Sequence, residues 1–218
     1  MDEPIIIIFI CIVIPLLPAL LFMEPKARKN VFFMVLGLFV CLAASFINGL
    51  ILSASEMEQY EMTFLVTPLT EELLKFLPTM LYVFLFRPKK KDIISAAVMV
   101  GIGFAILENT YIISSCISGA TVMFALIRGM GAGLMHGMCT FMTGYGLQYF
   151  YLRRKLAYAG SYALLIFAVV YHSCYNLLIQ SEYEILGLLL PVATVVIILF
   201  VHALNRGRVK KEKSEAKT

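Results

Sequence analysis

Apolar residues run almost unbroken along most of the chain and are interrupted only by short polar segments. A helix needs about 20 apolar residues to cross a hydrocarbon core of roughly 30 Å. Seven stretches are long enough, at residues 4–23, 31–52, 63–86, 93–115, 121–150, 157–179 and 185–204. The pattern therefore predicts an all-α, polytopic integral membrane protein, a helical bundle with about seven transmembrane helices.

The composition excludes a soluble domain. Of the 218 residues, 61% are hydrophobic and 15% are charged, and the mean hydropathy is +0.88. A soluble domain is about 45–50% apolar and about 25% charged. Five cysteines lie in or at the ends of apolar runs without a C-x-x-C spacing, which argues against a disulfide framework or a zinc ribbon.

The charges between the apolar stretches alternate in sign. Basic residues follow the first, third, fifth and seventh stretches, whereas acidic residues follow the second and sixth. The positive-inside rule then places the N-terminus outside and the C-terminus in the cytoplasm. The net charge of +4 comes mostly from these clusters and a basic tail, which suits anionic lipid headgroups better than nucleic acid.

The chain is predicted to be one membrane domain. Asp2 and Glu3 precede the first stretch and no small-residue cleavage site follows it, so we expect a retained anchor rather than a signal peptide. No repeat or linker divides the rest. We expect a single transmembrane domain over residues 1–205 and a basic cytoplasmic tail over 206–218.

Ionisable side chains lie inside four of the predicted spans. Each costs about 2.5 to 3.5 kcal/mol on insertion scales, so such residues usually face the bundle interior and mark a functional site. The ionisable residues are Glu71, Glu72, Lys75, Glu108, His136 and His172. The amides of Asn109, next to Glu108, and Asn176, four residues after His172, belong to the same candidate site.

The depths of these residues agree. Counted from the nearest basic cluster, Glu71 and Glu72 lie 16 and 15 residues from Arg87, and Glu108 lies 17 from Lys91. His136 lies 17 residues from Arg153, and His172 lies 17 from Lys155. At a rise of about 1.5 Å per residue, all five lie roughly 23 to 26 Å from the inner face, so we expect one site in the outer part of the bilayer.

Helical spacing predicts how these residues share faces. Glu71 and Glu72 are about 100° apart and should not both point at one centre, so we expect one to be chemical and the other structural. Lys75 can pair with either. Phe104 shares a face with Glu108, as His172 does with Asn176. Next to His136, small-xxx-small steps at Gly129, Gly133 and Gly137 predict a close approach of that helix to a neighbour.

Each feature also has a structural interpretation. Glu71 and Glu72 could form an ion pair with Lys75 that holds helices together. Glu108 with Asn109 could form an interhelical hydrogen bond. His136 could be a packing residue. We expect Arg128 at the outer headgroups and His202 with Asn205 at the inner ones. None of these three is assigned to the site.

The set nevertheless suits peptide hydrolysis. That reaction needs a base for water, donors for the developing oxyanion and an acid for the leaving nitrogen. Two histidines and a glutamate, here His136, His172 and Glu108, could also hold zinc with an open fourth position. No H-E-x-x-H motif fixes that geometry, so the residues leave a metallo-type and a glutamic-type hydrolase both open.

The motif set resembles the PrsW family of bacterial intramembrane proteases, which belongs with the CAAX prenyl proteases and bacteriocin-processing enzymes. The motifs are Glu71-Glu72-x-x-Lys75, Phe104-x-x-x-Glu108-Asn109, His136 and His172-x-x-x-Asn176. The resemblance implies a membrane hydrolase that cuts a peptide bond near the outer surface. In the best-known family role, the substrate is a single-span anti-sigma factor clipped on its extracytoplasmic side.

The resemblance also implies a role for each residue. Glu71 would activate the water with support from Glu72 and Lys75, while Asn109 would be structural support for Glu108. His172 and Asn176 would stabilise the oxyanion, and His136 would be a metal ligand or a proton donor. Glu108 stands where the CAAX branch has a histidine.

Two other function classes are consistent with polar residues inside a bundle. A transporter would also carry buried acids and histidines, but the sequence shows no obvious inverted repeat and its polar residues lie off the midplane. A non-catalytic scaffold or immunity protein of the same fold is the other alternative. Loss of function on replacing Glu71 would separate an enzyme from a scaffold.

Overall fold

The structure is a computed structural model that describes residues 3–149 and 154–215, apart from the side chains of 3, 154–157, 202 and 204–215. Within these ranges the chain forms eight helices and no strands, namely α1 (Glu3–Phe22), α2 (Pro25–Ala54), α3 (Gln59–Leu65), α4 (Thr67–Phe86), α5 (Lys90–Ser115), α6 (Val122–Leu147), α7 (Arg154–Ile179) and α8 (Glu184–Glu215). The predicted all-α bundle is confirmed. Arg153, His202, Asn205 and the basic side chains of the tail lie outside the description, although the α8 backbone is helical through Glu215.

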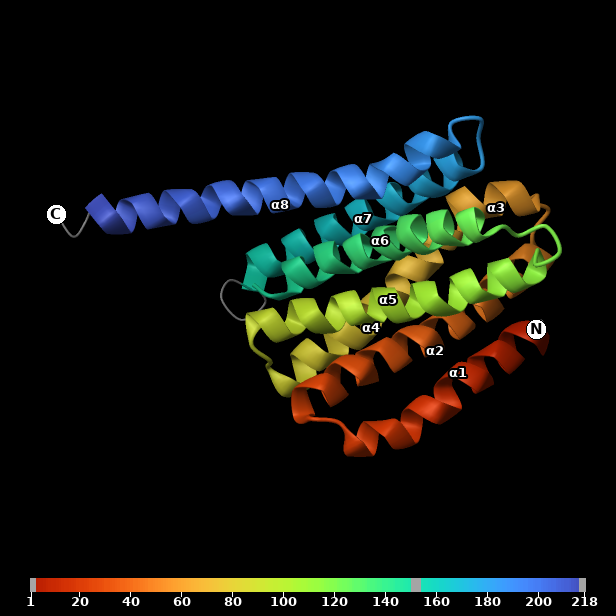
Figure 1. Cartoon of the computed structure of the whole chain (residues 1–218), viewed down its shortest axis with the longest axis horizontal. Coiled ribbons are helices and arrows are strands. Elements are labelled where there is room, and N and C mark those ends of the chain that lie inside the picture. Colours follow the sequence, from red (N-terminus) through yellow and green to blue (C-terminus); the bar gives the residue numbers. More distant parts are fainter. Residues whose placement is uncertain (1–2, 150–153, 216–218) are drawn as a thin grey trace.

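The helices form a row with one helix behind it. Neighbours in the row are α1, α2, α5, α6, α7 and α8, with α1 and α8 at opposite edges (Figure 1). α4 crosses behind the row and contacts α2, α5, α6 and α7. This central place allows side chains of α4 to meet side chains of α5, α6 and α7.

Seven long helices correspond to the predicted spans. Six of them, α1, α2, α5, α6, α7 and α8, are long and apolar enough to cross a membrane. The seventh, α4, has 20 residues, the same length as α1, and carries Glu71, Glu72 and Lys75 among its apolar residues. The predicted number of about seven spans agrees with this count for the described part of the chain.

The third predicted span is two helices rather than one continuous helix over 63–86. α3 ends at Leu65, and α4 begins at Thr67 after Val66, with Pro68 in its first turn. Proline has no backbone N–H, and its ring disfavours a helix that continues through it from the preceding turn. In the first turn of a new helix that N–H has no partner to lose. Pro68 therefore starts α4 just before the two glutamates.

The charged segments separate to the two ends of the bundle. The start of α2, with Lys26 and Arg28, and the turn between α4 and α5 lie at the same end as the C-terminus, on the left of Figure 1. The turn between α2 and α3, with Glu56 and Glu58, lies at the opposite end with the start of α1. This separation matches the alternation of charge in the sequence.

The close helix contacts are not at the glycines that the sequence singled out. A Cβ atom added at Gly129, Gly133 or Gly137 would meet nothing within 4 Å, so the predicted close approach there is wrong. Crowded glycines lie elsewhere, and two of them are on α5: a Cβ at Gly103 would overlap the carbonyl of Met34 on α2, and a Cβ at Gly101 would overlap the carbonyl of His136 on α6. Small residues predict only that a close approach is permitted, and the rotation of each helix decides where it occurs.

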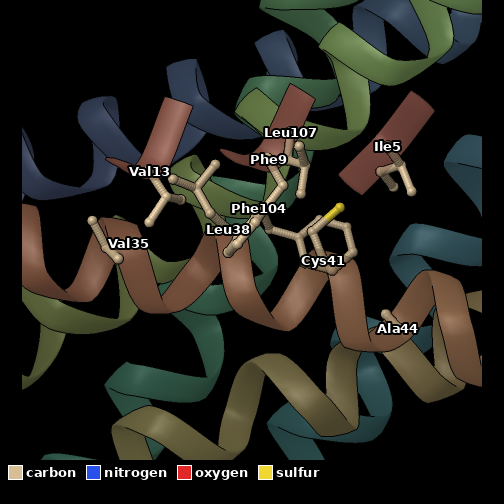
Figure 2. Packing of buried hydrophobic residues seen from close by; sticks show 9 residues of the cluster. All are labelled: Ile5, Phe9, Val13, Val35, Leu38, Cys41, Ala44, Phe104 and Leu107. Atoms are coloured by element: carbon tan, nitrogen blue, oxygen red, sulfur yellow. The ribbon is translucent and has the colours of Figure 1, made fainter. Parts of the chain in front are cut away.

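One apolar cluster joins α1, α2 and α5 (Figure 2). Ile5, Phe9 and Val13 of α1 lie against Leu38 and other residues of α2. Phe104 and Leu107 of α5 complete the cluster, and both are fully buried. Phe104 also lies at the polar cluster described next, so the apolar core and the candidate site share a wall.

Candidate active site

The three charged residues of α4 are buried at the centre of the bundle. Lys75 Nζ donates to Glu72 Oε1 at 2.6 Å and lies 3.9 Å from Glu71 Oε2. The spacing of three and four residues places both carboxylates one turn before the lysine on the helix. Lys75 and Glu72 are each 1% exposed and Glu71 is 5% exposed, so α4 carries a buried ion pair with a second carboxylate beside it.

His172 of α7 lies between the two glutamates. Its Nδ1 is 2.8 Å from Glu72 Oε1, and its Nε2 is 3.9 Å from Glu71 Oε2. The two carboxylates therefore lie at opposite nitrogens of one imidazole and do not point at one centre. This arrangement agrees with their separation of about 100° around the helix.

The hydrogen bonds fix the tautomer of His172. A carboxylate only accepts, so Nδ1 carries the proton that is donated to Glu72. In the neutral ring Nε2 then has a bare lone pair. His172 Nε2 and Glu71 Oε2 are both buried without a hydrogen-bond partner. Two unpaired acceptors therefore face each other.

His136 of α6 is linked on both ring nitrogens. Lys75 Nζ donates to His136 Nδ1 at 2.8 Å, and His136 Nε2 lies 3.0 Å from Glu108 Oε2 on α5. An ammonium can only donate, so Nδ1 accepts and the ring proton on Nε2 is donated to Glu108. The ring of Phe104 lies 4.9 Å from that of His136, and Lys75 Nζ lies 4.3 Å from the centre of the same phenyl ring.

Arg128 is a member of this site that the sequence analysis missed. Its Nη2 lies 3.5 Å from Glu108 Oε2 and its side chain is 17% exposed, so the guanidinium reaches the site. Arg128 precedes His136 by eight residues on α6, close to two helical turns, which puts both on related faces. That spacing was the available signal. We refer to Glu71, Glu72, Lys75, Glu108, Arg128, His136 and His172 together as the polar cluster.

The two asparagines lie apart from the polar cluster's hydrogen bonds. Asn176 Nδ2 donates to the carbonyl oxygen of Thr63 at 2.8 Å, which ties α7 to α3. Asn109 Oδ1 is buried without a partner, so the expected support of Glu108 is not made by a hydrogen bond. The structure thus brings together five of the predicted site residues with Lys75 and joins neither amide to them.

The balance of charge singles out Glu71. Three carboxylates face two permanent cations, Lys75 and Arg128, when both histidines are neutral. Glu72 hydrogen-bonds Lys75 and His172, and Glu108 hydrogen-bonds His136 and Arg128. Glu71 makes no hydrogen bond within the described part of the chain, so it is the one carboxylate of the three that the cluster leaves without a hydrogen-bond donor.

A cavity of 440 Å³ borders the polar cluster. Residues of α1 to α5 line it, and Glu71 and Glu108 are the cluster members in its lining. The side chain of Glu108 is 21% exposed, whereas that of His136 is fully buried. A molecule in this cavity would therefore meet the two carboxylates first, with the imidazoles beyond them.

The family model described as PrsW family intramembrane metalloprotease matches residues 25–204, which contain the whole polar cluster. This chain belongs to the PrsW family. It is therefore an intramembrane protease, and its apolar helices make it a multi-pass protein embedded in a lipid bilayer. Comparisons with curated proteins and with solved structures give no match. Helix α1 and the end of α8, residues 205–215, are the parts of the row outside the matched segment.

The family description implies a metal, and the side chains of this PrsW protein fit one. Ligand atoms of Glu71, His136 and His172 all lie within 4.8 Å of one another. Both ring nitrogens of His136 already take part in hydrogen bonds, so an ion bound there would replace one of those two contacts. Glu71 Oε2 and His172 Nε2 are the buried atoms without partners, and carboxylate oxygen and imidazole nitrogen are ordinary zinc ligands. Glu108, which the sequence suggested as the third ligand, lies outside that group and hydrogen-bonds His136. Glu72 would orient His172 from the far side of the ring, as carboxylates commonly do for ligand histidines.

Proposed function

We propose that this PrsW protein is an endopeptidase of the bacterial cell membrane that cuts a single-span, anti-sigma-factor-like protein near its extracytoplasmic face. One observation carries the proposal most directly. Glu71 is a buried carboxylate without a hydrogen bond, it borders the cavity, and it faces the bare nitrogen of His172. A carboxylate in this state is able to take a proton from water.

The chain supplies a base and the scaffold that positions it. Glu71 takes a proton from the water that attacks the peptide carbonyl, and it returns that proton to the leaving nitrogen as the carbon–nitrogen bond breaks. Glu72 holds the proton on His172 Nδ1, and Lys75 keeps Glu72 ionised while it bonds His136. Arg128 and Glu108 hold the other side of His136.

A metal bound by Glu71, His136 and His172 would polarise the peptide carbonyl and acidify the attacking water. The preference for these three residues rests on the two unpartnered acceptors at Glu71 and His172.

The position of the cavity supports cleavage near one membrane face. Gln59 and Met62 of α3 line it, and α3 lies at the end of the bundle opposite the basic segments. If the basic end is cytoplasmic, as the positive-inside rule predicts, the scissile bond lies at the extracytoplasmic end of the substrate span. Water then needs to reach only that part of the bundle.

The test compares membrane proteins in cells that carry the wild type or Glu71→Ala. We expect at least one single-span protein to accumulate uncut in the variant, and mass spectrometry should place its wild-type product terminus at the extracytoplasmic juxtamembrane segment. A cut at the cytoplasmic end of the span contradicts the proposed location. Identical fragment patterns in the two strains contradict the proposed activity.

The predicted topology has its own measurement. A cysteine placed at Lys90, in the basic turn between α4 and α5, should be protected from an impermeant thiol reagent added outside intact cells. A cysteine at Glu58, in the acidic turn before α3, should react. The opposite result would invert the orientation and move the site to the cytoplasmic side.

A further inference from the structure

We propose that Ser45 and Asn48 of α2, with Gln59 of α3, bind the backbone of an unwound segment of the substrate inside the cavity. This inference rests on the proposed function, because it names the wall of the same site that holds the substrate. None of these three residues belongs to the motifs that carry the chemistry.

The α2 wall of the cavity is a single stripe. Cys41, Ser45, Asn48 and Leu52 recur at intervals of three and four residues and all line the cavity, together with Gly49. Such spacing keeps side chains on one face of a helix. Glu71 and Glu108 come from α4 and α5, so the stripe and the two acids belong to different walls of one cavity.

The polar groups of this wall are not used by the fold. Ser45 and Gln59 make no hydrogen bond within the described part of the chain, although a helical serine usually bonds a carbonyl of the preceding turn. Ser53, two turns further along the same helix, does so and donates to the Leu50 carbonyl at 2.9 Å. Ser45 therefore keeps both a donor and an acceptor for a molecule in the cavity.

Asn48 is oriented by α4. The Thr70 hydroxyl donates to Asn48 Oδ1, so one edge of the amide is fixed and both Nδ2 protons stay available. Thr70 directly precedes Glu71 in α4, and its hydroxyl also lies 2.9 Å from the Thr67 carbonyl. The amide of Asn48 is thus attached to the segment that carries the base.

The substrate needs such partners. A peptide bond is accessible to attack only after the helix of the substrate opens, and each backbone N–H or C=O that then lacks a partner in an apolar environment costs several kcal/mol. A hydroxyl and two carboxamides offer donors and acceptors for an extended backbone without requiring a particular substrate side chain. We therefore assign them to substrate conformation rather than to side-chain specificity.

Gly49 provides room beside these groups. It lines the cavity, and a Cβ at this position would meet nothing within 4 Å. A substrate side chain can occupy that space, and a large residue at position 49 would fill it. Substitution there disturbs no existing contact, so it tests occupancy of the cavity separately from folding.

The experiment uses the purified full chain in phospholipid vesicles and the substrate found by the membrane comparison above. Asn48→Ala should lower kcat/KM by about 10- to 100-fold, the range for a lost hydrogen bond that leaves a buried group unsatisfied. Most of the effect should be in KM, because backbone binding is present both before and in the transition state. Ser45→Ala should act in the same direction, and Gly49→Leu should block cleavage.

Each variant has a matched control on the structure. Asn30 of α2 also accepts a hydrogen bond from a hydroxyl, that of Ser95 at 3.0 Å, but it does not line the cavity, so it is the control for Asn48. Ser53 lies on the same helix as Ser45 and outside the cavity lining, so it is the control for Ser45. Gly133 has the same open surroundings as Gly49 and lies outside the cavity lining. Asn30→Ala, Ser53→Ala and Gly133→Leu should keep the wild-type kcat and KM.

The outcomes separate the two proposals. Wild-type kcat/KM in both Asn48→Ala and Gly49→Leu overturns the binding wall while the protease activity stands. Equal losses in Asn48→Ala and Asn30→Ala overturn it as well, because they would reflect helix packing. If the wild type and Glu71→Ala give the same fragments in cells, the proposed function fails first and the binding wall fails with it.

Discussion

Glu71→Gln is expected to slow peptide-bond cleavage by about 100- to 10,000-fold, the range that a positioned general base contributes. Glutamine keeps the size of the side chain but cannot take a proton from water. Since Glu71 makes no hydrogen bond in the described structure, the substitution removes no stabilising contact of that kind. The amount of the variant in the membrane, measured by immunoblot, should therefore be normal. The cleavage rate of the purified variant should fall by the factor given above.

Glu61→Gln is the matched control for this change. Glu61 is an exposed residue of α3, lies 10 positions before Glu71 and does not line the cavity. Its replacement should leave the rate within about twofold of the wild type, because a solvated surface residue rarely changes stability by more than about 0.5 kcal/mol. Near-normal cleavage by Glu71→Gln would show that Glu71 is not the base. Glu108, the other carboxylate that borders the cavity, would then be the candidate base to test.

Lys75→Met should have the largest effect on stability, a loss of about 3 to 5 kcal/mol. Methionine fills a similar volume but leaves Glu72 without its ammonium partner at 2.6 Å and His136 without its donor at 2.8 Å. Lys75 is fully buried, so water cannot replace the lost charge. Unfolding in a denaturant series in detergent, together with the yield from membranes, measures the change.

Lys29→Met tests whether burial is the cause. Lys29 forms an ion pair with Asp92 at 2.8 Å, but the two side chains are 26% and 28% exposed. Exposed pairs of this kind contribute about 0 to 1 kcal/mol. A loss as small for Lys75→Met as for Lys29→Met would mean that the polar cluster is solvated and that the assigned ion pair does not stabilise the bundle.

The helices were predictable because the bilayer constrains them. A span needs a long apolar run, so α1, α2 and α5 to α8 follow from the sequence almost directly. The exception is the break at Val66, which depends on Pro68. A proline inside a membrane span can be accommodated, as Pro78 is within α4, or can begin a new helix. Local sequence does not distinguish the two outcomes.

Depth predicted which residues meet, but not how they pair. Counting along each helix placed Glu71, Glu108, His136 and His172 at one level, and the structure joins them through Lys75 and Glu72. Which nitrogen faces which oxygen depends on helix rotation and on side-chain torsions, which spacing does not specify. For the same reason Arg128 was not assigned to the site, and the close approach of α6 to a neighbour beside His136 occurs at Gly101 of α5 rather than at Gly133.

The charges of α4 also constrain how the nascent chain enters the membrane. Within α4 itself, Lys75 is the only partner available to Glu72 when the helix leaves the ribosome. His136 and His172, which complete the network, lie 61 residues beyond Lys75 and 100 residues beyond Glu72. At about 5 to 20 residues per second, the second interval lasts about 5 to 20 seconds. During that time the internal Glu72–Lys75 pair must keep α4 compatible with the bilayer, so the order of synthesis leaves α4 without its histidine partners until α7 has been made.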